Sequence, residues 1–64
     1  MRFEEFCNIL TSFGFIHKGG KRSHRVFTKE GIPEIMTIQN CEGRAKPYQI
    51  RQFCELVEQY HLLE

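Results

Sequence analysis

Residues 13–28 read FGFIHKGGKRSHRVFT, and the two glycine signals in this stretch set the order of the elements around it. Gly14 can end a helix, because glycine reaches positive φ without a clash of a Cβ atom. The pair Gly19-Gly20 offers the same freedom to a tight hairpin turn. The stretch therefore predicts the end of a helix, a short strand over residues 15–18 and a second strand from about Arg22 to Thr28.

Apolar residues upstream and downstream of this stretch follow the spacing of one helical face. A first helix is expected from about Arg2 to Phe13, and a second from Pro47 to about Leu62. Pro47 suits the first position of a helix, because the backbone N–H that proline lacks would have no partner within the helix at this position. The residues assigned to buried faces are Phe3, Phe6, Cys7, Leu10 and Phe13 in the first helix, and Ile50, Phe53, Cys54, Val57, Tyr60 and His61 in the second.

The segment between the hairpin and the second helix has room for one more strand. Residues 30–33 contain a glycine and a proline, and are expected to interrupt strand pairing. Residues 35–39 favour a short strand, and the polar residues 40–46 a loop. The sequence thus predicts one α+β domain over residues 1–64, in the order α-β-β-β-α, with a three-stranded antiparallel sheet and both helices packed on one face. A chain of 64 residues can build only one core.

Composition excludes several classes of protein. No apolar run approaches the roughly 20 residues that cross a bilayer, and the N-terminal residues lack the order of a secretory signal, so we expect a cytoplasmic protein without membrane contact. The three cysteines are far apart, which is not typical of a disulfide framework or a thiolate metal site; Cys7 and Cys54 are expected in helix cores and Cys41 in a loop. The eight acidic residues, all Glu, do not cluster as magnesium ligands. Neither a metal nor another cofactor is predicted.

The charge pattern concentrates cations in the hairpin. The net charge is only +1, but residues 17–29 hold five Lys and Arg and no carboxylate before Glu30. Such a segment can hold phosphates even in a nearly neutral molecule, and it can equally be a solvated hairpin. Charge alone leaves both interpretations open.

Of the three histidines, His24 is the candidate for chemistry. His17 and His61 are assigned to a strand and to a helix face, whereas His24 lies between Ser23 and Arg25 just beyond the glycine pair. RNA cleavage needs little more than a proton shuttle, because the ribose 2′-OH is an internal nucleophile next to the phosphorus. An imidazole exchanges protons near neutral pH, and nearby cations can neutralise charge on the phosphate. The residues expected to contact RNA are Lys18, Lys21, Arg22, Ser23 and Arg25.

Two segments of the chain resemble a known family. Residues 14–27, GFIHKGGKRSHRVF, are similar to the signature of HicA toxins, in which Gly-(Trp or Phe) leads after a fixed interval to Gly-Ser-His and then to an aromatic residue three positions past the histidine. Residues 45–53, AKPYQIRQF, resemble the opening of the last helix in one branch of HicA-like proteins. The order of elements is also that of the family, whose fold resembles a double-stranded RNA-binding domain.

The resemblance implies an mRNA interferase, the toxin of a type II toxin–antitoxin system, which cleaves mRNA without a metal and is restrained by a HicB-like antitoxin protein. His24 matches the catalytic histidine of the family and Ser23 the serine before it. Two departures bear on substrate preference and catalytic strength: Arg22 stands where the family usually has Gly, and Gly19 where a basic residue is common. The proline and histidine that often follow the third strand are absent, with Gln39 and Cys41 nearby instead.

Alternatives to catalysis remain open at this point. The chain can be a non-catalytic binding module for double-stranded RNA, or a degenerate toxin retained for pairing with its antitoxin. The free chain is expected to be a monomer. Strand alternation gives a check on the site: a buried Phe27 would leave His24 facing solvent, whereas Val26, on the same face as His24, argues for the opposite orientation.

Overall fold

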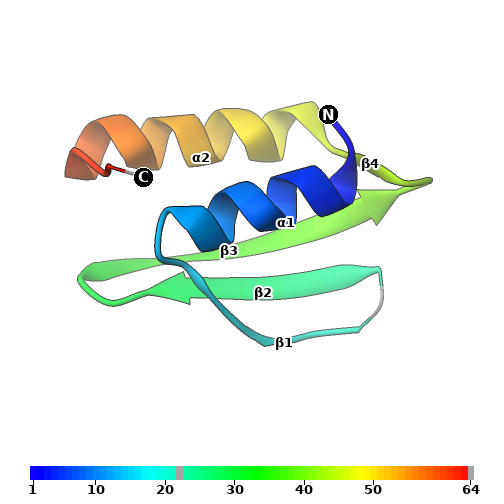
Figure 1. Ribbon diagram of the computed structural model, residues 1–64, viewed down its shortest axis with the longest axis horizontal. Coiled ribbons are helices and arrows are strands. Elements are labelled where there is room, and N and C mark those ends of the chain that lie inside the picture. The colour runs from blue at the N-terminus through cyan, green and yellow to red at the C-terminus, as the bar shows by residue number, and fades with distance from the viewer. Residues whose placement is uncertain (22, 64) are drawn as a thin grey trace.

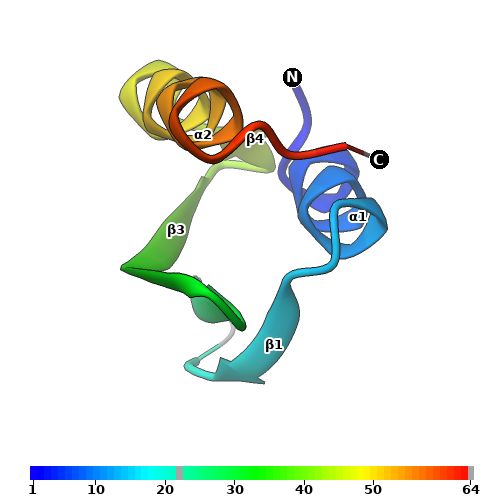
Figure 2. The same cartoon turned by 90° about the vertical axis from the view of Figure 1, so that its left-hand side faces the viewer.

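The computed structural model describes residues 1–21 and 23–63, and these form an α+β fold, as the sequence predicts. Two helices lie over one face of a curved antiparallel sheet whose strand order is β1-β2-β3-β4 (Figures 1 and 2). The opposite face of the sheet, which we call the outer face, is not covered by either helix. The elements are α1 (Phe3–Ser12), β1 (Ile16–Gly19), β2 (His24–Lys29), β3 (Ile32–Cys41), β4 (Arg44–Ala45) and α2 (Pro47–Tyr60).

The prediction of a three-stranded sheet is wrong, because residues 40–46 are not a loop. β3 continues to Cys41, and a turn at Glu42 and Gly43 leads into β4, which pairs with β3 through Asn40↔Ala45 and Cys41↔Arg44. A strand of two residues shows no periodicity in a sequence, so the pattern of residue types could not reveal it.

β3 also begins earlier than predicted, at Ile32, and includes Pro33. The register of β2 with β3 is irregular between the pairs Phe27↔Met36 and Lys29↔Ile32. Pro33 lies within this irregular segment, where regular ladder pairing is already interrupted. A proline is tolerated in a sheet at such a bulge because its missing N–H breaks no regular hydrogen bond.

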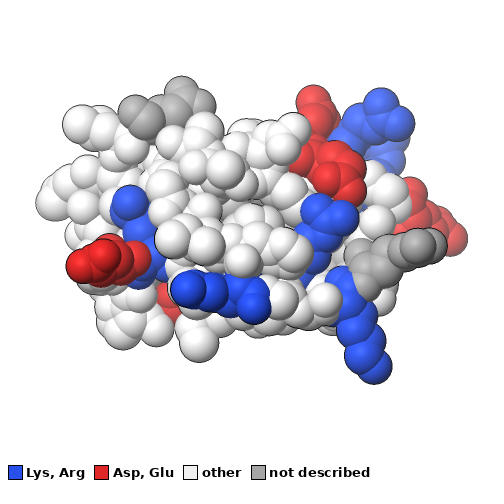
Figure 3. Space-filling view, turned by 60° about the horizontal axis from the view of Figure 1, so that its bottom comes forward, with Lys and Arg blue, Asp and Glu red and all other residues white. Residues whose placement is uncertain are grey.

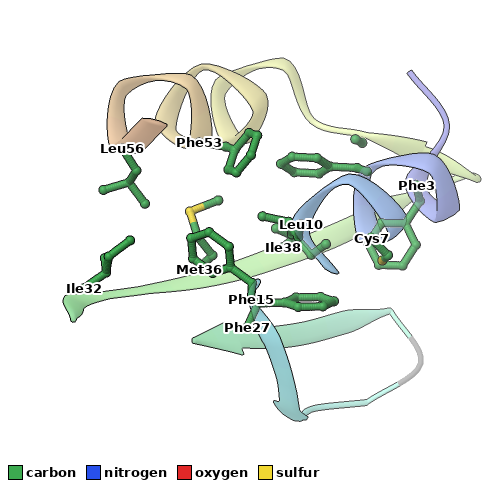
Figure 4. Packing of buried hydrophobic residues seen from close by; sticks show 12 residues of the cluster. Phe3, Cys7, Leu10, Phe15, Phe27, Ile32, Met36, Ile38, Phe53 and Leu56 are labelled. Atoms are coloured by element: carbon green, nitrogen blue, oxygen red, sulfur yellow. The ribbon is translucent and has the colours of Figure 1, made fainter. Parts of the chain in front are cut away.

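The core lies between the helices and the inner face of the sheet (Figure 4). Phe53 of α2 is at its centre and makes edge-to-face contacts with Phe6, Phe13 and Phe15, at centroid distances of 5.9, 5.1 and 6.0 Å. Such contacts add to the burial of apolar area. The buried hydrophobic residues are Phe3, Phe6, Cys7, Leu10, Phe15, Phe27, Ile32, Met36, Ile38, Ala45, Phe53 and Leu56.

The buried face of α2 differs from the predicted one. Gln49, Phe53 and Leu56 are buried, whereas Cys54 and His61, which the sequence pattern assigns to the core, are exposed. Cys7 is buried as expected, and Cys41 is exposed at the end of β3. His61 follows α2 with a φ of 53°, so it ends the helix in a left-handed conformation. The buried stripe therefore includes a polar residue, Gln49.

Gln49 is buried because its amide completes the free edge of β3. The backbone N–H of Gln39 donates to Gln49 Oε1 at 2.9 Å, and Gln49 Nε2 donates to the carbonyl oxygen of Thr37 at 3.0 Å. β4 pairs only with Asn40 and Cys41, so this stretch of β3 has no strand beside it on that side within the described residues. A buried amide with both of its groups hydrogen-bonded avoids the cost of unpaired polar atoms.

Neither described helix is long and apolar enough to cross a membrane.

The end of α1 follows the sequence prediction, since Gly14 has a φ of 93°. The start of α2 also matches, with Pro47 in its first turn.

Candidate functional site

His24 is the first residue of β2 and is exposed on the outer face of the sheet. It pairs with Gln39 of β3 in the antiparallel register. Phe27 points to the opposite, inner face and is only 2% exposed. The alternation predicted for this strand is therefore confirmed, and Val26 shares the outer face with His24 without forcing the imidazole into the core.

The backbone around His24 is held by hydrogen bonds on both sides of the residue. The N–H of His24 donates to the carbonyl oxygen of Lys21 at 3.0 Å, and the N–H of Asn40 in β3 donates to the carbonyl oxygen of Ser23 at 2.8 Å. β2 begins at His24, and the predicted strand start at Arg22 lies outside the described residues. These bonds fix where the imidazole leaves the sheet.

Gly20 shapes the same turn from the other side. Its φ is 108°, and a Cβ atom at this position would collide with the carbonyl oxygen of His24. The prediction that Gly19-Gly20 supplies positive φ is confirmed, since Gly19 has a φ of 148°. Of the two, only Gly20 is also required by close contact, because nothing lies within 4 Å of a Cβ built on Gly19.

Ser23 contacts the imidazole directly. Its Oγ lies 3.1 Å from His24 Nδ1. When Nδ1–H donates to this hydroxyl oxygen, Nε2 is the unprotonated ring nitrogen and can accept a proton. The structure therefore brings together two of the predicted site residues, Ser23 and His24.

The predicted cations do not all gather around His24. Lys18 is exposed in β1 at a β-bulge, and Lys21 is exposed in the β1–β2 turn. The predicted contact residue Arg22 lies outside the described residues. Figure 3 shows basic side chains spaced along this side of the molecule, with other surface between them. The field along the hairpin comes from separated charges rather than from a dense patch.

Arg25 is placed away from His24, on the inner side of β2. Its guanidinium makes two hydrogen bonds to the carboxylate of Glu4, with Nη1–Oε1 at 3.3 Å and Nη2–Oε2 at 3.1 Å. It also lies 5.1 Å from the centre of the Phe3 ring, an arrangement that allows a cation–π interaction. Arg25 thus fastens β2 to α1 and does not share a face with the imidazole.

Cys7 lies beside Arg25 but is not an activated thiol. Its Sγ is 3.5 Å from Arg25 Nη1. Burial raises the pKa of the Cys7 thiol above its usual range, and this effect outweighs the lowering by the Arg25 charge. The thiol stays protonated near neutral pH, so we assign it to the core.

The other two histidines have different surroundings. His17 stacks on Phe27 with ring centroids 5.3 Å apart, and its Nε2 lies 2.9 Å from the carbonyl oxygen of Gly19. His61 ends α2. No three His, Cys, Asp or Glu side chains among residues 1–21 and 23–63 gather as a metal site.

Sequence reasoning missed a second basic site on the outer face. Arg2 forms an antiparallel bridge with Arg44 of β4, and both arginines line an open pocket together with Glu42 and Gly43. The pair is not visible in the sequence, because it depends on β4 and on the pairing of the N-terminal segment with it.

Comparison with protein-family models, with curated proteins and with solved structures found no match to this chain.

Proposed function

We propose that this chain is a HicA-type mRNA interferase, a metal-independent endoribonuclease that uses His24 as its catalytic residue. The observation that carries the proposal is the accessible imidazole at the start of β2, with the Ser23 hydroxyl on Nδ1. Neither helix covers this face, so a ribonucleotide can approach the ring (Figure 2).

The reaction requires one bond to form and one to break. The ribose 2′-oxygen attacks the adjacent phosphorus, and the bond from phosphorus to the 5′-oxygen breaks, which leaves a 2′,3′-cyclic phosphate and a 5′-hydroxyl. His24 Nε2 takes the 2′-OH proton while water protonates the departing 5′-oxygen, or, when protonated, it gives a proton to the 5′-oxygen while water takes the 2′-OH proton. General acid–base catalysis of this kind contributes about 10²–10⁴-fold. Lys18, Lys21 and Arg22 supply the positive field that favours a phosphate near the hairpin.

The resemblance to HicA toxins also supports a proposal for the cellular role of the chain. The chain acts as the toxin of a toxin–antitoxin pair in the cytoplasm, and a HicB-like antitoxin covers His24 or the hairpin. The helix–strands–helix order and the position of both helices on one face support a fold similar to a double-stranded RNA-binding domain. The additional strand β4 is a departure from the simple three-stranded plan.

One observation favours a second function, RNA binding without catalysis. Arg25, which sequence reasoning placed next to the reacting phosphate, is committed to Glu4 on the inner face. A binding module needs cations along the RNA backbone but none beside an imidazole. This alternative includes a degenerate toxin that is kept only for its antitoxin.

The test compares wild type, His24→Ala and His61→Ala on defined single-stranded RNA, with the ends of the products identified by mass. We expect His24→Ala to cleave about 10²–10⁴-fold more slowly and to keep its RNA affinity. His61→Ala, which changes an exposed imidazole at the end of α2, serves as the control and should cleave normally. Equal cleavage by all three proteins, or products with 3′-hydroxyl ends, contradicts the proposal. RNA binding without cleavage by the wild type supports the binding module.

A further inference from the structure

Arg2 and Arg44 face each other at the closest approach that an antiparallel pair allows. The N–H of Phe3 donates to the carbonyl oxygen of Gly43 at 2.9 Å, and the N–H of Ala45 donates to the carbonyl oxygen of Met1 at 3.0 Å. These bonds flank the bridge between the two arginines, so Arg2 and Arg44 form a non-hydrogen-bonded pair. In such pairs the Cα atoms are only about 4.5 Å apart and the side chains are closest.

Arg2 and Arg44 carry like charges across the bridge that pairs them. Like charges directly opposite each other destabilise a sheet. Within the part of the chain that the structure describes, the ion pair joins Arg25 to Glu4, and neither Arg2 nor Arg44 is bridged to a carboxylate. Glu42 lines the same pocket, and Glu5 accepts a hydrogen bond from the backbone N–H of Arg2 rather than from its side chain. An anion held between the arginines would relieve their repulsion.

The register of the sheet puts this pair on the same face as His24. His24 pairs with Gln39, and Arg44 pairs with Cys41, two residues further along β3. Gln39 and Cys41 point to the same side of the strand, because side chains alternate with a period of two. Ala45 points to the inner face and is 7% exposed, which agrees with an outward Arg44. From strand spacing and rise, the Cα atoms of His24 and Arg44 are about 12 Å apart.

We infer that Arg2 and Arg44 together bind one backbone phosphate of the RNA, a few nucleotides from the linkage at His24. The inference rests on the proposed function, since it describes how the same substrate lies on the protein. The RNA strand then crosses β2, β3 and β4 on the outer face rather than following the β1–β2 hairpin. Guanidinium groups suit this role, because they donate paired hydrogen bonds to phosphate oxygens. Glu42 lowers the affinity of the pocket for an anion.

The experiment measures RNA affinity in the His24→Ala background, where the substrate stays intact. The double variant Arg2→Gln/Arg44→Gln should bind an oligoribonucleotide weaker by a factor on the order of tenfold for each arginine. The slope of log affinity against log salt should become shallower by about 0.7 for each phosphate of a single strand that the variant leaves unneutralised. Arg51→Gln, which removes the same charge from an exposed position on α2, is the matched control and should change neither quantity much. Glu42→Gln should strengthen binding.

RNA length distinguishes a strand-binding site from a site for a free anion. A dinucleotide bound at His24 cannot reach the arginines, so the double variant should bind it as the parent does. Inorganic phosphate should compete only weakly with the longer RNA. The inference is overturned if the double variant binds long RNA with unchanged affinity and salt slope, or if phosphate alone binds as tightly as RNA. Unchanged cleavage by His24→Ala would instead overturn the proposed function, so the two failures are distinct.

Discussion

Gly20 packs against the backbone of His24 so closely that any side chain at residue 20 would overlap the His24 carbonyl oxygen. We expect Gly20→Ala to disrupt the start of β2, because the alanine meets both a positive φ of 108° and this steric overlap. Cleavage should fall sharply, and stability should fall by more than the roughly 1–2 kcal/mol that a left-handed alanine costs by itself. Urea unfolding and cleavage rates measure the two effects.

Gly31→Ala is the matched control for this prediction. Gly31 has a φ of 90°, and nothing lies within 4 Å of a Cβ built on it. Its substitution should therefore cost only the backbone strain and leave cleavage nearly unchanged for the folded fraction. If the two variants lose equal stability and equal activity, the contact between Gly20 and His24 does not position the site.

Arg25 should matter for stability and not for the chemistry. Arg25→Ala removes the ion pair with Glu4 and the contact with the Phe3 ring, and we expect a loss of about 1–2 kcal/mol. Glu4→Gln breaks only the partly exposed ion pair, so its cost should be about 0.5 kcal/mol or less. Cleavage per folded molecule should stay close to wild type in both variants. A large drop in cleavage by fully folded Arg25→Ala would return this residue to the RNA-contacting set.

The sequence predicts the elements whose buried residues follow a regular apolar spacing, and it does not predict the features that depend on contacts between distant residues. α1 follows one apolar stripe, so the sequence alone predicts its four buried residues, whereas Phe13, also predicted, follows the helix and is only partly buried. In α2 the buried stripe contains Gln49, and Cys54 next to Phe53 is exposed. A prediction that assigns apolar residues to the core therefore chooses the wrong face of this helix. The buried amide of Gln49 hydrogen-bonds to the edge of β3, and no local sequence pattern reveals this partner.

In the candidate site, too, some features follow from the local sequence and others only from the packed structure. The exposure of His24 follows from strand alternation against Phe27, which the sequence contains. The separation of Arg25 from His24 also follows from alternation, but the partner of Arg25 is Glu4, 21 residues away, and only the packed structure brings them together. The pairing of Arg2 with Arg44 depends on a strand of two residues.

Gln49 should stabilise the fold through its two hydrogen bonds to β3. Gln49→Ala leaves the N–H of Gln39 and the carbonyl oxygen of Thr37 without this partner, and we expect a loss of about 1–3 kcal/mol. Hydrogen exchange at the Gln39 amide should accelerate selectively. Gln52→Ala, at an exposed position of the same helix, should have little effect on either measurement. Unchanged exchange at Gln39 would show that this amide is protected without the Gln49 side chain and would contradict the predicted role of the hydrogen bond.

The titration of Tyr60 should make the stability of the fold depend on pH in the alkaline range. Its hydroxyl donates to Glu34 Oε1 at 2.7 Å, and this hydrogen bond raises the pKa of Tyr60 above its ordinary value, with smaller effects from desolvation and from the Glu34 charge. The folded state therefore favours the protonated phenol. Its contribution to stability is complete below the ordinary tyrosine pKa of about 10 and is lost as pH rises through the folded value.

The measurement follows tyrosinate absorbance in Tyr48→Phe, where Tyr60 is the remaining tyrosine of the two in the chain. Adding Glu34→Ala should lower the titration midpoint toward the ordinary value, because it removes both the acceptor and the charge. The difference in unfolding free energy between the two proteins should also shrink as the pH rises above about 10. A midpoint that does not move would mean that Tyr60 and Glu34 are not hydrogen-bonded in solution, and that this contact does not join α2 to β3.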